Sequence, residues 1–316
     1  MQKLLITGGT GFLGKELAIK LRNDYDLLLA GRNNKQNQIA KNITKCDVMP
    51  MDVTSSESVK DIFNHFKPNI VIHAAATKFV DLSEKYPMEC IDVNIKGSQN
   101  IARSCIDSNV DSLIGVSTDK ASPPVKNVYG MSKSIMERLF CSVNGRNNTR
   151  IACVRYGNVA WSTGSVFPIW KQMHTKNKII QTTGPEMRRF VFSVKEAVDL
   201  ILNSMKLRDK VAGKVLSRRM KAAKIKDILE IWIEKFGGTY EAVKGRPGER
   251  IDEFLIGKEE IPYTEHLDIN GIDHFLLTFN QKVTKPIDNY ISSENAENLS
   301  SEEILKIISN PPIYEN

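Results

Sequence analysis

Tyr129 and Lys133 are the residues whose types and spacing most directly indicate proton-transfer chemistry in this chain. They are four residues apart where the pattern becomes helical, so their side chains would lie on one face, one turn apart. A neighbouring ammonium stabilises a phenolate, which brings the Tyr129 hydroxyl nearer to the range where it can exchange a proton. The spacing by itself is equally typical of an ordinary surface pair. Its place after a buried strand at 112–116 and the polar turn 117–120 favours the catalytic interpretation.

A glycine-rich turn near the N-terminus indicates a dinucleotide site. A short apolar run at 4–7 has strand character, and the turn Gly8-Gly9-Thr10-Gly11-Phe12-Leu13-Gly14 leads from it into a segment of helical periodicity. Strand, glycine turn and helix in this order are what a dinucleotide fingerprint requires. Gly8 would allow the tight turn, Gly11 the close approach of a pyrophosphate, and Gly14 the packing of the helix on the strand. The helix N-terminus would supply N–H groups to the phosphates.

The end of the second predicted strand, residues 26–32, bears on which dinucleotide is bound. Sites for NAD usually carry a carboxylate there, which binds the ribose 2′-hydroxyl. This chain has Arg32 instead, with Lys35 nearby. Because a guanidinium pairs bidentately with a phosphate, the sequence favours NADP over NAD. Asp52, at the end of the next strand, could accept a hydrogen bond from the adenine amino group.

Strand-like and helix-like segments alternate through the first half of the chain. Further apolar runs of strand character lie at 48–53, 69–73, 112–116 and 151–155. The alternation predicts an α/β fold, a Rossmann-like doubly wound parallel sheet whose ligand lies at the carboxyl ends of the strands. We interpret His73 as a strand-end histidine with satisfied hydrogen bonds. The small residues Ala74, Ala75 and Ala76 after it would let the backbone pass close beside a cofactor.

The alternation is lost after residue 160, and the later half is typical of a smaller domain that covers a substrate. An amphipathic helix is predicted at 193–205 and a short helix at about 300–308. We assign residues 1–160 and about 185–215 to an NADP-binding Rossmann domain, and residues 161–184 and 216–316 to a nucleotide-sugar-binding domain and tail.

Composition narrows the class of protein. The 316 residues are 41% hydrophobic and 26% charged, as in ordinary globular proteins, and the net charge of +7 is compatible with an anionic ligand or with simple solubility. The basic run at 218–221 lacks interleaved aromatics, so we interpret it as a solvated face and expect no nucleic-acid partner. Five cysteines without paired spacing predict no metal site and favour a reducing compartment. Since we find neither a signal peptide nor a membrane span, we expect a cytoplasmic protein.

These motifs together resemble the extended short-chain dehydrogenase/reductases. More narrowly, they resemble the polysaccharide-biosynthesis branch that contains soluble, inverting UDP-N-acetylglucosamine 4,6-dehydratases. The resemblance covers nearly the whole chain. Besides the glycine turn, Asp119-Lys120 and Tyr129-x-x-x-Lys133, it rests on Ala74-Ala75-Ala76-x-Lys78, Tyr86-Pro87, Asn94-x-x-Gly97, Arg155-Tyr156-Gly157-Asn158-Val159, Gly164-Ser165-Val166, Met187-x-Arg189-Phe190, Arg246-Pro247-Gly248-Glu249 and Ser293-x-Asn295-Ala296.

The resemblance implies a mechanism in which Asp119-Lys120 is decisive, since retaining members carry Asp-Glu at this turn. Tyr129, assisted by Lys133, would take the C4 hydroxyl proton while a hydride passes to NADP. Lys120 would then remove the C5 hydrogen while a protonated Asp119 protonates the departing C6 hydroxyl. Hydride return to C6 and reprotonation of C5 from the opposite face would invert that centre. A like charge on oxidised nicotinamide would push Lys120 towards its neutral form, and burial would favour protonated Asp119.

The resemblance also implies binding roles. Cofactor contacts are expected from Gly8, Thr10, Gly11, Phe12, Leu13, Gly14, Arg32, Asp52, Val53, Ala74, Ala75, Ala76, Lys78, Asn94, Tyr129, Lys133, Tyr156, Asn158 and Val159. Substrate contacts are expected from Lys78, Thr118, Asn158, Ser165, Val166, Arg189, Arg246 and Glu249. In this set Arg189 and Arg246 would hold the diphosphate, Glu249 the ribose and Thr118 the sugar hydroxyls; for Arg189, Arg246 and Glu249 a structural salt bridge is the alternative. The expected substrate is UDP-N-acetylglucosamine or a similar UDP-hexose, and the expected assembly is a homo-oligomer, a dimer or hexamer.

Two residues depart from the family pattern, and two alternative functions remain. Gly184 and Arg188 break a stretch that is Asp-Pro-x-Met-Thr-Arg-Phe in relatives, and Arg188 adds positive charge near the expected nucleotide site. A UDP-sugar 4-epimerase or 4-ketosugar reductase would need Tyr129 and Lys133 but no acid–base pair at 119–120. A non-catalytic NADP-sensing regulator would need none of these side chains, and the chain keeps them all.

Overall fold

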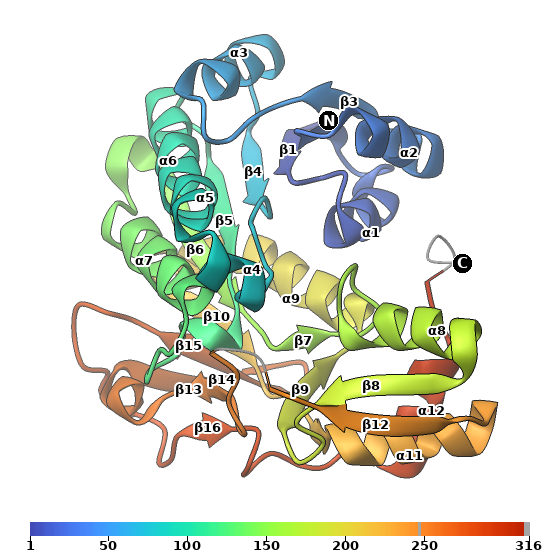
Figure 1. Ribbon diagram of the computed structural model, residues 1–316. Helices are drawn as coiled ribbons and strands as arrows, with labels where there is room; N and C mark the ends of the chain where they lie inside the picture. The colour runs from blue at the N-terminus through green and yellow to red at the C-terminus, as the bar shows by residue number, and fades with distance from the viewer. Residues whose placement is uncertain (246–247, 313–316) are drawn as a thin grey trace.

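The structure, a computed structural model, describes residues 1–245 and 248–312. Its centre is a nine-stranded sheet in the order β14-β15-β10-β6-β5-β4-β1-β2-β3 (Figure 1). The strands in that order are β14 (Thr264–Ile269), β15 (Ile272–Leu277), β10 (Val215–Arg218), β6 (Arg150–Arg155), β5 (Ser112–Val116), β4 (Ile70–His73), β1 (Lys3–Thr7), β2 (Asp26–Gly31) and β3 (Asp47–Pro50). From β10 to β3 all neighbours are parallel, and β15 and β14 are antiparallel.

Helices cover both faces of the sheet, which confirms the predicted doubly wound fold. Separate apolar clusters fill the two faces, one around Leu4, Ile6 and Leu29 and the other around Leu5 and Leu28. The alternation along β1 and β2 therefore buries both sides of each strand, as a parallel sheet requires. In Figure 1 one group of helices lies to the left of the sheet and another to the right; the helices are α1 (Phe12–Leu21), α2 (Asn34–Thr44), α3 (Ser56–Phe66), α6 (Gly97–Asp107), α7 (Val128–Ser142), α9 (Val194–Lys206) and α10 (Arg208–Val211).

The chain reverses its direction of winding at β1, which has β2 on one side and β4 on the other. The carboxyl ends of β1 and β4 pair as Thr7 with His73, and the glycine turn follows the first of them directly. In open α/β sheets a ligand binds at such a switch point, outside the carboxyl ends of the strands. The topology therefore places the predicted dinucleotide site here.

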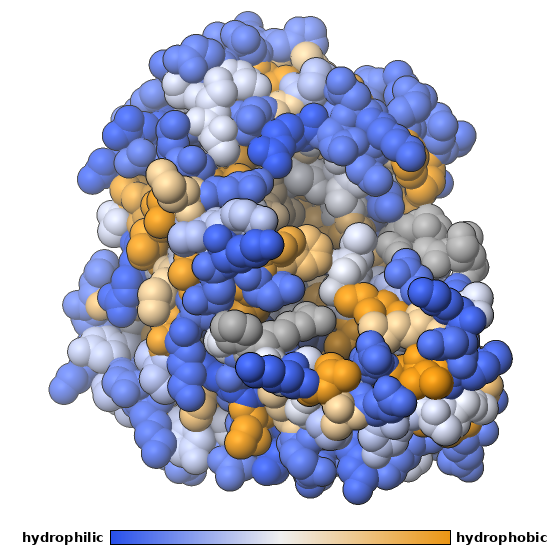
Figure 2. Space-filling view, in the orientation of Figure 1, coloured by the Kyte–Doolittle hydropathy of each residue, from blue (hydrophilic) through white to orange (hydrophobic). Residues whose placement is uncertain are grey.

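A second region packs around its own aromatic core. Trp161, Phe167, Trp170 and Trp232 are buried there and contact one another. Its elements are β7 (Asn158–Val159), α8 (Val166–Asn177), β8 (Ile179–Thr183), β9 (Arg188–Phe192), β11 (Ala222–Lys224), α11 (Ile225–Phe236), β12 (Thr239–Val243) and α12 (Ser301–Ser309), with the pair β13 (Phe254–Ile256) and β16 (Ile291–Ser292) beside them. Figure 2 shows the molecule hollowed between this lower region and the upper part of the sheet.

Several local predictions can be compared with these elements. The helices predicted at 193–205 and about 300–308 are present, and each begins with a capping box, Ser193 with Glu196 and Ser300 with Glu303. The large sheet extends further than predicted, because the hairpin at 264–277 belongs to it. Within the described residues no helix is long and apolar enough to cross a membrane.

Arg155, at the end of β6, ties the later part of the chain to helix α7. Its guanidinium is fully buried, donates to both carboxylate oxygens of Glu137 at 2.6 and 2.9 Å, and donates to both oxygens of Glu260 at 2.8 Å. Glu137 lies on α7, and Glu260 lies in the 3-10 segment Lys258–Tyr263. A buried arginine with this many charge-assisted hydrogen bonds holds the elements around it in one arrangement.

The basic side chains of the run at 218–221 form ion pairs with carboxylates. Arg218 contacts Glu196, Arg219 contacts Asp273, and Lys221 contacts two glutamates, Glu297 and Glu303. Carboxylates therefore offset the positive charges of this run.

Candidate active site

The glycine turn after β1 is shaped by close backbone approaches. Gly8 has φ +67°, and a Cβ there would lie 2.7 Å from the backbone N of Ala75. A Cβ on Gly14 would lie 2.4 Å from Gly9 Cα, so only glycine lets α1 pack this closely on the turn. Gly11 occupies the N-cap of α1, where no side chain competes for the free N–H groups. These contacts match the roles expected of Gly8 and Gly14.

A pocket opens beside this turn, and six of the nineteen expected cofactor residues line it. It is lined by Gly8, Ala30, Arg32, Met51, Asp52, Val53, Ala75, Ala76, Thr77 and Val93. The Arg32 side chain is 63% exposed at its rim and lies 3.6 Å from Glu89. Asp52 keeps one oxygen engaged with the N–H and hydroxyl of Thr54. Thr10, Phe12 and Leu13 are not in the lining; Phe12 packs instead into the aromatic core.

Asn94 does not line this pocket but forms hydrogen bonds with a backbone segment that does. The residue is buried in a π-helical turn, Asp92–Lys96. Its amide accepts from Thr77 N at 2.8 Å and donates to Thr77 O at 2.9 Å and to Ser132 Oγ at 2.9 Å. It therefore fixes the segment after β4 and ties it to α7.

His73 has both ring nitrogens occupied, as the sequence predicts. They are hydrogen-bonded to Thr7 Oγ1 at 2.7 Å and Ser98 Oγ at 3.0 Å, and the side chain is fully buried. Burial, with a smaller contribution from Lys133, lowers the pKa of His73 from 6.5 to about 3. His73 is thus a neutral structural residue.

This histidine makes a contribution to stability that depends on pH. Between pH 6.5 and 3 the unfolded chain binds a proton on His73 that the folded chain does not, so stability falls as pH falls through this window. We expect His73→Gln to remove a slope of up to about 1.4 kcal/mol per pH unit from the free energy of unfolding. Urea unfolding of both proteins from pH 7 to pH 4 measures the difference. Equal slopes would contradict the assignment.

Tyr129 and Lys133 lie in the first half of α7 and are both buried. Asn127 caps this helix, accepting from Gly130 N at 2.7 Å. Burial raises the pKa of Tyr129 to about 12, against opposing effects of the Lys120 charge and a hydrogen bond with Thr118. Burial lowers the pKa of Lys133 to about 8. The expected lowering of the Tyr129 pKa by Lys133 is therefore wrong for this state: the cation that acts on Tyr129 is Lys120.

The Asp119-Lys120 pair follows β5 in the 3-10 turn Asp119–Ala121. Lys120 Nζ donates to Asp119 Oδ1 at 3.0 Å and lies 3.5 Å from Glu253 Oε1. Thr118 Oγ1 also donates to Asp119 Oδ1, at 2.9 Å. The other oxygen, Asp119 Oδ2, is buried and has no hydrogen-bond partner in the described part of the chain. A buried carboxylate oxygen in this condition calls for an explanation, and a hydrogen bond with a bound ligand would supply one.

The charge state of Lys120 differs from the expected neutral form. Burial lowers the pKa of Lys120, but the carboxylates of Asp119 and Glu253 outweigh it, so the pKa is raised overall. Two nearby carboxylates thus favour the ammonium form of Lys120. The expectation of a neutral lysine concerned the enzyme loaded with oxidised nicotinamide, whose positive charge would act in the opposite direction.

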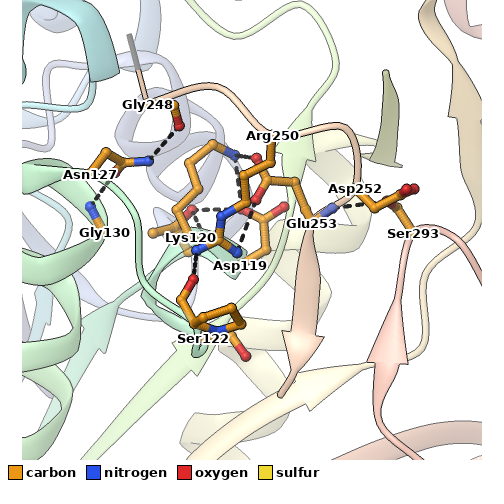
Figure 3. A network of polar contacts seen from close by, with 12 residues as sticks. Asp119, Lys120, Ser122, Asn127, Gly130, Gly248, Arg250, Asp252, Glu253 and Ser293 are labelled. Carbon is orange, nitrogen blue, oxygen red and sulfur yellow. Dashed lines mark hydrogen bonds and ion pairs between the residues drawn. The ribbon is translucent and has the colours of Figure 1, made fainter. Parts of the chain in front are cut away.

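Sequence reasoning missed Arg250 and Glu253, which reach this pair from the segment before β13 (Figure 3). Both side chains are 4% exposed, and Arg250 Nη1 lies 3.8 Å from Glu253 Oε2. Arg250 Nη2 donates to Pro124 O, whereas its Nε and Nη1 have no hydrogen bond within the described ranges. No motif marks these residues, because only the fold brings Glu253 to Lys120 and Arg250 to Glu253.

The residues expected to hold UDP lie close to the same segment. Arg189 donates to the backbone carbonyls of Arg188, Arg250 and Ile251, and no carboxylate pairs with it among the described residues. Glu249 accepts from Thr183 Oγ1 at 3.0 Å. Arg188, the residue that departs from the family pattern, lies 3.2 Å from Asp252, so its charge is offset. Arg246 lies outside the described residues.

The remaining residues expected to bind cofactor or substrate differ in burial. Tyr156 is buried beside it, with its carbonyl accepting from Asp119 N at 2.9 Å, and burial raises its pKa. Asn158 and Val159 form the short strand β7, where Asn158 is exposed. Ser165 caps α8 and Val166 begins it. Lys78 is exposed over the ring of Phe79, and the backbone of Ala74 joins β1 through Thr7 O. The described residues contain no cluster that could hold a metal ion.

Residues 4–273 match the family described as polysaccharide biosynthesis protein. Among similar proteins, a UDP-glucose 4-epimerase of Rickettsia bellii is 31% identical over 97% of this chain and 95% of its own length. A UDP-N-acetylglucosamine 4,6-dehydratase (inverting) of Campylobacter jejuni is 32% identical over 82% of this chain and 78% of its own length. The relatives thus carry names of two different reactions.

Solved structures show the same fold. The X-ray structure of Pen from Bacillus thuringiensis has a TM-score of 0.90 at 26% identity and covers 98% of this chain and 97% of its own. A UDP-glucose 4-epimerase of Thermus thermophilus, solved in complex with NAD, has a TM-score of 0.68 at 20% identity and covers 78% of this chain and 88% of its own.

Proposed function

The chain belongs to the polysaccharide biosynthesis protein family, a branch of the extended short-chain dehydrogenase/reductases, and on this premise we propose that it is an NADP-dependent, inverting UDP-N-acetylglucosamine 4,6-dehydratase. The observation that carries the proposal is the buried pair Asp119-Lys120, joined to Tyr129 through Thr118. Hydride transfer at C4 needs only Tyr129 and Lys133. A second acid–base pair beside them is what the elimination of water across C5 and C6 requires.

The cofactor site proposed for this reaction is the pocket beside Gly8. The N-cap of α1, Gly11, makes no side-chain cap hydrogen bond, so the first turn of the helix can offer backbone N–H groups to a pyrophosphate. Lys133, which is buried one helical turn after Tyr129, would donate a hydrogen bond to the nicotinamide ribose. The chemistry that a bound nicotinamide supplies is hydride acceptance from C4 and hydride return to C6.

Each polar side chain of the site is assigned one step of the proposed reaction. Tyr129 is assigned the C4 hydroxyl proton; because its pKa is raised, it must first release its own proton, which the Lys120 charge and the hydrogen bond with Thr118 favour. Lys120 removes the C5 hydrogen once the C4 ketone has acidified it. Asp119 protonates the departing C6 hydroxyl, while Oδ2, the oxygen that has no partner within the described residues, is open to a hydroxyl of the sugar. The C5 centre is then reprotonated from the opposite face by a proton that derives from solvent.

The nucleotide is proposed to lie along the segment around Arg250. Arg189 presents a guanidinium held by carbonyls rather than carboxylates, so its charge is available to a diphosphate. Arg246 and Glu249 follow as the second diphosphate contact and the ribose contact. Lys78, Asn158, Ser165 and Val166 border the sugar and nucleotide. Assembly as a homo-oligomer and location in the cytoplasm remain predictions.

A UDP-sugar 4-epimerase is the second candidate, favoured by the Rickettsia bellii relative, which covers almost the whole chain. Mass spectrometry of the UDP-sugar after incubation separates the two reactions. The dehydratase lightens UDP-N-acetylglucosamine by one water, whereas an epimerase gives an isomer of unchanged mass. An isomer without any dehydrated product would favour the epimerase.

Arg32 is proposed to select NADP over NAD. Its guanidinium lies at the rim of the pocket and makes one long contact, to Glu89, so it can turn to a 2′-phosphate. We expect Arg32→Ala to weaken NADP binding roughly 10- to 100-fold and to leave NAD binding nearly unchanged, as for loss of a charged hydrogen bond. Fluorescence titration with both dinucleotides measures this. Lys41→Ala, at an exposed lysine farther along α2, is the matched control, and equal losses for both dinucleotides would contradict the role.

A further inference from the structure

The Lys120 ammonium lies between two buried carboxylates from distant parts of the chain. Asp119 Oδ1 is 3.0 Å away on the same turn, and Glu253 Oε1 is 3.5 Å away on the segment before β13. Asp119 is fully buried and Glu253 is 3% exposed. Glu253 is itself held in place, because its backbone N donates to Ser293 Oγ at 3.0 Å and its carbonyl accepts from Ser293 N at 2.8 Å.

The hydrogen bond within the pair matters for the proposed reaction. The ion-pair geometry of Asp119 and Lys120 corresponds to a carboxylate beside an ammonium, whereas the elimination needs a carboxylic acid and a neutral amine. The two forms contain the same number of protons. Transfer of one proton along the 3.0 Å hydrogen bond converts one form into the other without exchange with solvent.

Other charged groups around Lys120 bias this transfer. Arg189, on β9, disfavours the ammonium form of Lys120, and Glu253 favours it. Tyr129, on α7, also lies within electrostatic reach. Arg250 faces Glu253 rather than Lys120, with Nη1 at 3.8 Å from Glu253 Oε2. Glu253 is thus the one carboxylate on Lys120, among the described residues, that has no part in the proposed elimination.

We propose that Glu253 is a positioning residue that holds Lys120 beside Asp119 and sets which member of the pair carries their shared proton. This inference rests on the proposed function. In the first step the Lys120 N–H bond breaks and an O–H bond forms on Asp119. In the elimination Lys120 gains the C5 proton while Asp119 loses its proton to the departing hydroxyl, which leaves as water. The pair returns to the ion pair seen in the structure.

Lys120 can be observed directly by NMR of protein labelled with 13C at the lysine Cε. The spectrum of Lys120→Met assigns the signal. We expect the titration midpoint of Lys120 to move down by about one pH unit or more in Glu253→Gln, because a counter-charge is removed. Glu253→Asp should restore part of the shift. Asp252→Asn is the matched control, since that neighbouring carboxylate pairs with Arg188 instead.

The pH profile of kcat for loss of water provides the second readout. If the shared proton governs the rate, both limbs of the profile move to lower pH in Glu253→Gln, whereas a purely structural role would lower kcat equally at every pH. An unchanged Lys120 midpoint, or a shifted midpoint with unmoved limbs, overturns the inference. Failure of the proposed function is distinct from either result, because wild-type protein would then release no water from the UDP-sugar at any pH.

Discussion

Lys120→Met should lower the rate of water loss from UDP-N-acetylglucosamine by about 10³-fold, within the range that general acid–base groups contribute. The substitution removes the amine that takes the C5 proton and leaves Tyr129 and Lys133 in place. The methionine side chain has similar length, so packing beside Asp119 is largely retained. The rate is measured from the dehydrated product under conditions that saturate both the dinucleotide and the UDP-sugar.

Lys126→Met is the control, since Lys126 lies in the loop before the same helix and its side chain is exposed. It should retain full activity. Binding of NADP and of UDP to Lys120→Met should also be preserved within a few fold. A variant that binds both ligands and still releases water at the wild-type rate would remove Lys120 from the mechanism.

Arg155→Met should destabilise the fold by about 3–5 kcal/mol, the typical loss when one partner of a buried ion pair is removed. The substitution leaves Glu137 and Glu260 buried and facing each other without their shared cation. Because Glu137 lies on α7 and Glu260 lies in the later half, the lost contact also loosens the attachment between them. Urea unfolding followed by circular dichroism measures the change.

Arg150→Met is the comparison, because Arg150 lies on the same strand and pairs with Asp209 at the surface. Exposed pairs contribute roughly 0–1 kcal/mol, so this variant should unfold close to the wild type. Similar losses for the two variants would show that Arg155 does not have the structural role assigned to it.

The fold was largely predictable because its signals are local. The strand at 4–7, the glycine turn and the following helix are adjacent in the sequence, and a parallel sheet follows from repeated alternation. The hairpin at 264–277 was not recognised as part of that sheet. Its pairing partner, β10, is about 60 residues away along the chain, and no periodicity specifies such a distant contact.

The candidate site was predictable where its residues share a short segment. Thr118, Asp119 and Lys120 are consecutive, and Tyr129 follows on the next helix, so their proximity could be expected. Glu253 was missed for the opposite reason, since its contact with Lys120 spans more than a hundred residues and carries no motif. The charge state of Lys120 depends on that contact and could not be derived from the turn alone.

Burial also changed the electrostatic prediction for the helix. The four-residue spacing correctly suggested that Tyr129 and Lys133 would share a face, but it gave no measure of how deeply they lie. Desolvation dominates both groups, raising the pKa of Tyr129 and lowering that of Lys133. Spacing in a sequence indicates which groups are near each other, whereas burial decides which form each group takes.

Proton NMR of the purified protein with UDP-N-acetylglucosamine and trace NADP in D2O tests the central claim most directly. The proposed mechanism predicts a new C6 methyl signal, deuterium at C5, and coupling constants of the L-arabino 4-keto sugar. A methyl signal with D-xylo couplings would retain the dehydratase but contradict inversion through Lys120. If no methyl signal forms and the C4 epimer of the UDP-hexose accumulates instead, the proposed dehydratase reaction itself is contradicted.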